Sequence, residues 1–278
     1  MRASKYLRAG ALTAVLALAL TACGGDDGGA AIASLEDTSG QTIGVQSATT
    51  GEMYANENAP DDAEIQAFEN PGDLLTALQS GQVDAVLQDL PVNAEFARNN
   101  EGFEIVEEYD TGEQYGFAVA EEGSDELLSA INDALSQLRD GDTYQTIFDK
   151  YFATEDAPTE IPSQEPMDGV DASNFGLITD GTLTVCSDIP YAPFEFEEDG
   201  EFTGFDIDLM RAIAQKLGLE LEVKAIGFDP IQSGTALNSD QCDVAASAMT
   251  ITEEREENLN FSEPYYDAKQ SLLAPTSE

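Results

Sequence analysis

The chain has 278 residues, of which 42% are hydrophobic, and 55 acids against 11 bases give a net charge of −44. This length and composition suit a folded chain of one large or two modest domains, and the charge excludes nucleic acid and anionic lipid as partners. Histidine is absent, which excludes His-based acid–base catalysis and His-ligated metal sites. We expect no cofactor and no metal.

The first residues predict an exported lipoprotein. Three bases precede an uncharged run over residues 9–22, which is typical of a signal peptide and too short for a membrane-spanning helix. Small residues before Cys23 resemble the bacterial lipobox, so we expect a signal peptide at 1–22 and lipid attachment at Cys23. An ordinary signal peptide with an incidental cysteine is the alternative. Residues 23–33 then form a flexible tether at the outer face of the cell membrane.

Loss of the signal peptide leaves eight bases beside all 55 acids, a net charge of −47. So acidic a surface indicates adaptation to high salt, where screening relieves self-repulsion.

Short apolar runs alternate with helical periodicity over residues 42–152. We expect strands at 42–45, 65–68, 83–87 and 116–119, and helices at 50–56, from Pro71, at 126–138 and at 144–152. Residues 154–175 are acidic and contain three prolines, which predicts an exposed linker. The alternation then resumes, with strands at 183–186, 221–225, 243–247 and 270–273 and helices at 206–217 and 231–237. The fold class is therefore α/β, with mixed sheets flanked by helices.

A short internal sequence repeat indicates two related lobes. Residues 76–84 match residues 235–243 at a constant offset of 159, each copy being a helix end, a polar turn and a buried strand; chance similarity is the alternative. Ligands in such sheets collect beyond the carboxyl ends of the strands. Those ends are Gln88–Asp89 and Ser247–Ala248, so two facing lobes would enclose a cleft there.

Two cysteines remain after Cys23. Cys186 lies on a predicted strand, and Cys242 opens the strand-like segment 242–246. An even pair in an oxidising compartment favours a disulfide, and two buried free thiols remain open as the alternative.

A helix start at Thr252 carries Arg255 in its first turn. A guanidinium at that end opposes the helix dipole and needs an anionic partner, for which a carboxylate suits its geometry. A surface salt bridge explains the pattern equally well.

A resemblance to a known family decides between these readings. Segments 188–196 (DIPYAPFEF), 204–209, 249–255 and 261–266 resemble the N-terminal half of the polar amino-acid binding proteins that serve ABC importers. Segments 44–52, 81–89 and 142–152 resemble the C-terminal half of that family. The halves stand in reversed order, so the resemblance implies a circularly permuted, two-lobed periplasmic-binding-protein fold.

In that order, residues 34–120 form the lobe of the family's C-terminal half, and the helices of 121–153 pack on the other lobe. After the linker, residues 176–278 form the second lobe and end in a hinge strand. Residues 115–120 would be the only covalent crossing between the lobes, and the strand at 270–273 would end freely in a looser hinge.

The resemblance also implies a ligand site for a zwitterion. Arg255 and the backbone amides of Thr250 and Thr50 would hold the α-carboxylate, and Asp89, the Thr250 hydroxyl and the Ala248 carbonyl the α-ammonium. Tyr191 and Phe228 would sandwich the side chain, and Asp188 would face its end. Ser247 and Thr49 complete the expected set. Core packing is the alternative for Phe228 and a turn acid for Asp89, whereas Asp206 is expected to cap a helix. Ala48 stands where the family often has glycine.

The function implied is capture of a polar or cationic amino acid, by a monomer, for delivery to an ABC permease. The alternative is an enzyme on the same fold, a dehydratase acting on prephenate or arogenate, which needs a positioned acid. A receptor's sensory lobe is a third class, which usually adjoins a transmembrane segment.

Overall fold

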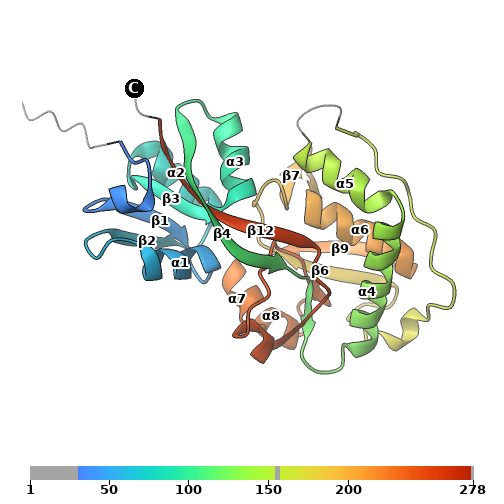
Figure 1. Ribbon diagram of the computed structural model, residues 1–278. Helices are drawn as coiled ribbons and strands as arrows, with labels where there is room; N and C mark the ends of the chain where they lie inside the picture. The colour runs from blue at the N-terminus through green and yellow to red at the C-terminus, as the bar shows by residue number, and fades with distance from the viewer. Residues whose placement is uncertain (1–30, 154–156, 277–278) are drawn as a thin grey trace, which may run out of the picture. The chain divides into compact units, whose positions relative to one another are not determined.

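A computed structural model of the protein describes residues 31–153 and 157–276 (Figure 1). The predicted signal peptide, Cys23 and most of the tether lie outside these residues. Within the described ranges, we find no helix with both the length and the apolar character needed to cross a membrane.

The first lobe is built on a five-stranded sheet of order β2-β1-β3-β12-β4. The parallel strands β1, β2 and β3 come from the first part of the chain, whereas the antiparallel β12 comes from its end. The strands are β1 (Thr42–Gln46), β2 (Glu64–Phe68), β3 (Ala85–Asp89), β4 (Phe103–Tyr115) and β12 (Tyr266–Pro275), and the helices are η1 (Leu35–Thr38), α1 (Thr50–Asn58), α2 (Pro71–Ser80) and α3 (Leu90–Asn99).

The second lobe contains a five-stranded sheet of order β11-β5-β10-β6-β9. Its strands are β5 (Ala118–Ala120), β6 (Thr182–Ser187), β9 (Glu220–Ala225), β10 (Val244–Ala245) and β11 (Leu259–Phe261), with a hairpin of β7 (Phe196–Glu198) and β8 (Glu201–Thr203) beside it. Its helices are α4 (Asp125–Asp140), α5 (Thr143–Phe152), α6 (Phe205–Leu217), α7 (Phe228–Gln232) and α8 (Thr235–Asn238), with 3-10 turns η2 (Ala172–Asn174) and η3 (Arg255–Glu257).

The two lobes exchange strands. β12 inserts between β3 and β4 of the first sheet, and β5 inserts between β10 and β11 of the second. When the second sheet is read from its other edge, as β9-β6-β10-β5-β11, the fourth strand of each sheet comes from the other half of the chain. In Figure 1, β4 and β12 run side by side toward the second lobe.

This exchange corrects the expected hinge. Among the described residues, the chain crosses between the sheets at 116–117 and again at 262–265, so the expectation of a single covalent crossing is wrong. The final strand is also held more firmly than expected, because it is an inner strand paired on both sides. Neither lobe is one continuous stretch of sequence: β5, placed with residues 34–120, belongs to the second sheet, and β12 to the first.

The helix α2 illustrates why these segments fold as they do. The side chain of Asn70 accepts hydrogen bonds from the backbone of Gly72 and Asp73, and Pro71 occupies the first helical position. Gly81 ends the helix in a left-handed conformation, with φ of 71°. Such a cap and stop fix both ends of an amphipathic helix.

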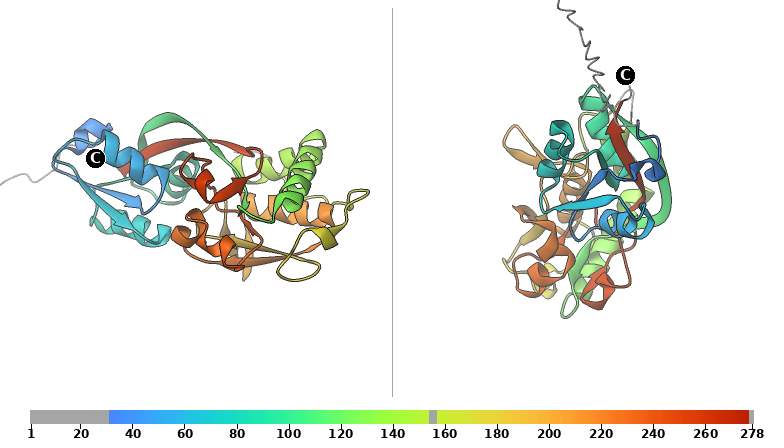
Figure 2. Two further views of the ribbon diagram at one scale, coloured as in Figure 1. Left: turned by 90° about the horizontal axis from the view of Figure 1, so that it is seen from below. Right: turned by 90° about the vertical axis from the view of Figure 1, so that its left-hand side faces the viewer.

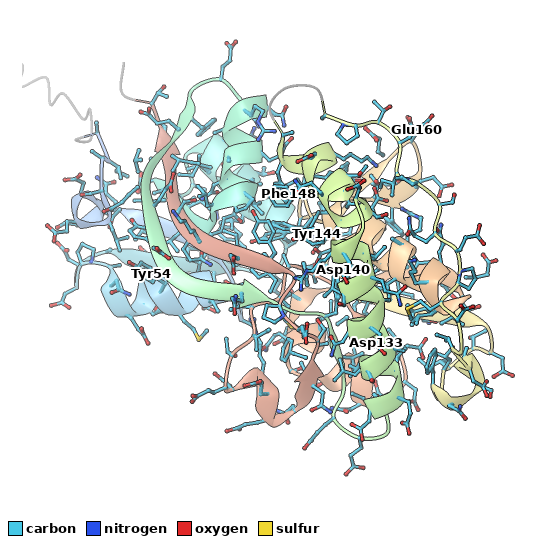
Figure 3. The ribbon with its side chains drawn as sticks, turned by 45° about the vertical axis from the view of Figure 1, so that its right-hand side comes forward. Tyr54, Asp133, Asp140, Tyr144, Phe148 and Glu160 are labelled. Atoms are coloured by element: carbon cyan, nitrogen blue, oxygen red, sulfur yellow. A yellow bond between two sulfur atoms is a disulfide. The ribbon has the colours of Figure 1, made fainter. Side chains whose placement is uncertain are left out.

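α4 and α5 pack on α6 in the second lobe. In Figure 3, Tyr144 and Phe148 on α5 point toward the start of β12. The Tyr144 hydroxyl donates to the Tyr265 carbonyl at 2.6 Å, and the Phe148 ring stacks on Tyr266. These contacts bind the last strand to the second lobe as well as to the first.

The linker is less exposed than its composition suggests. Its apolar residues Ile161, Met167 and Val170 pack against the core, and the Met167 amide donates to the carbonyl of Lys216 at the end of α6. Figure 2 shows this segment, in yellow, on the side of the second lobe remote from the first sheet.

Candidate functional site

One cavity gathers the predicted site residues from both lobes. Gln46, which the sequence analysis did not select, also lines it. The lining residues are Gln46, Thr49, Thr50, Asp89, Asp188, Tyr191, Phe228, Ser247, Ala248, Thr250 and Arg255. The ten selected residues are therefore brought together, at the carboxyl edge of both sheets.

The start of α1 forms the first-lobe wall. Thr49 caps the helix by accepting from the Glu52 amide at 3.2 Å, and the Glu52 carboxylate accepts from the Ala48 amide at 2.7 Å. Ala48 has φ of 63°, the left-handed region that favours glycine. Thr49 and Thr50, at the start of this helix, both line the cavity, and a helix start is a favourable place for an anion.

Asp89 lies at the end of β3 and is a partner in two hydrogen bonds. Its carboxylate accepts from the Tyr191 hydroxyl at 2.7 Å and from the Gln270 amide at 2.6 Å. Burial, followed by the nearby charge of Glu113, raises the pKa of Asp89 to about 6. Asp89 is therefore a buried acid oriented by both lobes and by the last strand.

Arg255 is 4% exposed and lines the same cavity as Asp89. Its guanidinium donates to the carbonyl of Thr250 at 2.7 Å and, across the cleft, to that of Ala48 at 3.1 Å. It also lies over the Phe228 ring, 5.2 Å from the centroid. Burial lowers the pKa of Arg255 to about 10.

None of the four ion pairs within residues 31–153 and 157–276 involves Arg255. Its neutral carbonyl partners leave the buried positive charge without a bonded anion. A buried charge in this state favours an anionic ligand. Arg255 begins the short turn η3, so the expected α-helix is wrong here, although Thr252 does accept from the Arg255 amide at 3.3 Å.

Asp188 and Gln46 meet at the same cavity. The Gln46 amide donates to Asp188 at 2.6 Å, and the Ser247 hydroxyl accepts from the Asp188 backbone at 3.0 Å. Burial raises the pKa of Asp188 to about 6. The sequence signal for Gln46 was its position at the carboxyl end of β1, the same edge that carries Asp89.

Glu113, on β4, was also missed. Its carboxylate accepts from the Thr50 and Thr250 hydroxyls, at 2.7 Å each, and so connects the two lobes. The strand that carries it alternates acids with apolar residues and did not stand out among the many acids of the chain.

The structure also tests the expectations for the two cysteines and for Asp206. Cys186 and Cys242 form a disulfide, one of the two alternatives that the sequence left open. Asp206 does not cap a helix: its carboxylate accepts from the Ala248 amide at 2.8 Å and from the Tyr265 hydroxyl at 2.6 Å. The expectation of a cap is therefore wrong.

The arrangement suits a small zwitterion. An unneutralised guanidinium and a helix start stand on the same cavity as two buried acids, with the Tyr191 and Phe228 rings in the wall. Charge-assisted hydrogen bonds to both ends of one ligand are available in this geometry. Within the described residues, we find no cluster of acids or cysteines that could hold a metal ion.

Comparison with known proteins gives a family match over most of the chain. The model described as bacterial extracellular solute-binding proteins, family 3, matches residues 25–154 and 183–278. The matched segments contain every residue of the cavity wall.

Individual relatives match shorter stretches. The arginine-binding extracellular protein ArtP of Bacillus subtilis is 40% identical over 84 residues, 30% of this chain and 32% of its own length. A probable histidine-binding protein of Campylobacter jejuni is 41% identical over 92 residues, 33% of this chain and 35% of its own. The chain thus spans about a third of the length of these relatives. The arginine-bound form of domain 1 from TmArgBP is 35% identical, with a TM-score of 0.30, over 34% of this chain and 81% of that one.

Proposed function

The chain belongs to the bacterial extracellular solute-binding proteins, family 3, and we propose that it captures a polar or cationic L-amino acid between its lobes for delivery to an ABC importer. The observation that carries this proposal is the buried guanidinium of Arg255, which has only carbonyl oxygens as partners in a cavity that also contains two acids. Such a set of groups complements an α-carboxylate and an α-ammonium on one small molecule.

In the proposed complex, the α-carboxylate binds Arg255 and the backbone amides of Thr50 and Thr250. The α-ammonium binds Asp89, the Thr250 hydroxyl and the Ala248 carbonyl. The ligand's side chain would then lie between two aromatic rings, those of Tyr191 and Phe228, which bind an apolar stem through their faces.

Asp188 sets the proposed ligand class. It lines the cavity with the neutral Gln46 as its side-chain partner, and the whole chain has 55 acids against 11 bases. A second carboxylate on the ligand would be buried without a cation, which is costly. Polar and cationic amino acids are therefore favoured over glutamate and aspartate, in keeping with relatives named for arginine and histidine.

The proposal includes anchoring by lipid at Cys23, a monomeric state and a permease partner. It also includes a circular permutation. Its support is the order of the resembling segments, the family match in two separate segments and the short individual matches.

The alternative function is a dehydratase. Dehydration requires an acid free to donate to the substrate, whereas Asp89 already accepts from Tyr191 and Gln270. We therefore favour binding without turnover.

A thermal-shift screen of the twenty amino acids, followed by calorimetry, tests the proposal. A ligand at about 100 times its dissociation constant stabilises the folded state by about 2.7 kcal/mol. We expect such a shift for one or a few polar or cationic amino acids. No shift with any of the twenty, or turnover of prephenate or arogenate, would refute the proposal.

A further inference from the structure

Two carboxyl groups lie buried behind the cavity wall and outside the ligand contacts proposed above. Glu195 and Asp206 are both 0% exposed. Their segments are locked together, because the Asp206 amide donates to the Phe194 carbonyl at 3.0 Å. Gly204 approaches so closely that an added Cβ would lie 2.1 Å from the same carbonyl oxygen, and its φ of 125° also requires glycine. The two side chains therefore start from adjacent, fixed backbone.

Each carboxyl uses one oxygen to support the wall of the cavity. Glu195 Oε1 accepts from the Ser247 hydroxyl at 2.7 Å. Asp206 Oδ2 accepts from the Ala248 amide and from the Tyr265 hydroxyl. Ser247 in turn accepts from the Asp188 amide, so the pair supports three residues of the cavity wall, Asp188, Ser247 and Ala248.

The other oxygen of each carboxyl has no donor among the described residues: Glu195 Oε2 and Asp206 Oδ1 are both buried and unpartnered. A buried acceptor without a donor is costly. The two carboxyls accept from consecutive residues, Ser247 and Ala248, and two carboxylates held so near one another cannot both remain ionised cheaply. One proton placed between the two oxygens would satisfy both.

The charged surroundings also oppose double ionisation. The groups that act on Glu195 are the acids Asp206, Asp188 and Asp89. Asp206 faces the phenols of Tyr265 and Tyr144. Burial, followed by the charge of Asp206, raises the pKa of Glu195 well above its usual range, and burial raises that of Asp206 to about 7.

We propose that Glu195 and Asp206 share one proton between Oε2 and Oδ1, and that this pair positions the Ser247–Ala248 wall of the cavity. The proton stays on the pair, with Glu195 as donor and Asp206 as acceptor or the reverse. They are positioning residues, since neither lines the cavity. The shared proton does not depend on the identity of the ligand; only its effect on binding rests on the proposed function.

A double-mutant cycle of amide variants tests the sharing. In Glu195→Gln, the new NH₂ group donates permanently to Asp206, and in Asp206→Asn it donates to Glu195, so each single variant keeps the bond. In the double variant two NH₂ groups face each other. We expect each single variant to lower Tm by less than about 4 °C, and the double variant to lower it by at least about 5 °C more than their sum.

Glu195→Gln combined with Asp243→Asn is the matched control. Asp243 is a buried acid of the same lobe that accepts from the amides of Ile178 and Thr184. It shares no partner with Glu195, so these two losses should add. Additive losses in the Glu195–Asp206 cycle as well would overturn the proposal.

The dependence of Tm on pH distinguishes a shared proton from a purely packing role, because a change in packing alone would lower Tm equally at every pH. The folded pKa of Glu195 is raised, so its contribution is complete below about pH 4.5 and is lost as pH rises through the folded pKa. Glu195→Gln lacks this loss, and its Tm relative to wild type should improve steadily from about pH 5 to pH 9. A constant difference would overturn the proposal, whatever the ligand assays show.

Infrared spectroscopy of the wild-type protein tests the shared proton even if a variant fails to fold. The wild-type protein at about pH 7 should show a carbonyl band of a protonated carboxylic acid that shifts in D₂O, and Glu195→Gln or Asp206→Asn should lack it. Absence of the band in the wild-type protein would contradict the shared proton. For whichever amino acid the screen identifies, Ser247→Ala should weaken binding by about tenfold, whereas Glu195→Gln at pH 7 should change it less than about threefold.

Discussion

The side-chain amide of Gln46, in the first lobe, donates a hydrogen bond of 2.6 Å to the carboxylate of Asp188, in the second. This contact fixes a buried acid at one end of the ligand cavity without neutralising it. An acid in that state is available to a cationic side chain, and a neutral polar side chain can replace the amide hydrogen bond.

Asp188→Asn should therefore separate ligands by charge. We expect it to weaken binding of arginine or lysine at least tenfold, about 1.4 kcal/mol, while glutamine binding changes less than threefold. Calorimetry on both ligand types measures the difference. Glutamate bound more tightly than glutamine or arginine by the wild-type protein would refute the assigned ligand class.

The pH dependence of binding should also show whether Asp188 contacts the side chain of the ligand. The raised pKa of Asp188, about 6, means that its negative charge is lost as pH falls through that value. The pKa of Asp89 is also about 6, and in the proposed complex this acid binds the α-ammonium of every ligand. Glutamine affinity should therefore fall below pH 6 through Asp89, and arginine affinity should fall further through both acids. Equal losses for the two ligands would show that Asp188 does not contact the side chain.

Removal of the central guanidinium should abolish capture. Arg255→Ala leaves an α-carboxylate without its cation, a loss of about 2–4 kcal/mol, or roughly 30- to 1,000-fold in affinity. Arg98→Ala is the matched control, because Arg98 is an exposed arginine on α3 whose side chain is 59% exposed. We expect calorimetry to detect no binding to Arg255→Ala and unchanged binding to Arg98→Ala. Wild-type affinity in Arg255→Ala would mean that the pocket is wrongly assigned.

The disulfide should stabilise the second lobe. It joins residues separated by 56 positions, and closing a loop of this length reduces the entropy of the unfolded chain. The Cys186→Ser/Cys242→Ser double variant should lose about 2–4 kcal/mol of unfolding free energy in urea titrations. Reduction of the wild-type protein should give the same loss, and no change in either case would contradict a stabilising bridge.

The sequence was most informative where one segment determined its own structure. α2 has a capping asparagine, a proline at its first position and a terminating glycine, and the predicted start at Pro71 agrees with the structure. β4 was missed because alternating acids such as Glu104, Glu108 and Glu113 obscure its apolar face; only pairing with β12 reveals it as an edge strand. The helix expected at 231–237 is interrupted by Gly234 in the left-handed conformation.

In the site too, residues marked by a local sequence pattern could be predicted, whereas a residue whose contacts form only in the folded protein could not. The ten selected residues depended on a family resemblance and on strand ends. Glu113 could not be selected in this way, because its role arises from hydroxyls of Thr50 and Thr250, 200 positions apart, that meet only in the folded protein.

Strand exchange leads to a prediction about the linker. A cut between Thr159 and Glu160 would divide the chain into one fragment with β5, α4 and α5 and another with β12. Each fragment then supplies an inner strand to the other's sheet. Glu160 is exposed and lies on the outer surface in Figure 3, so a cleavage site for a sequence-specific protease can be inserted there.

The nicked protein should therefore remain one particle in gel filtration and keep ligand affinity within about threefold of the intact chain. β12 pairs with β3 from Gln270 to Leu273 and with β4 over most of its length, and pairing of this extent is lost only when a whole sheet opens. A chain that stops after Glu263 is the matched comparison: it lacks β12, leaves β4 without its partner and β3 paired with β1 alone, and should fail to bind. Separation of the nicked fragments without denaturant would show that the covalent linker, rather than the exchanged strands, holds the lobes together.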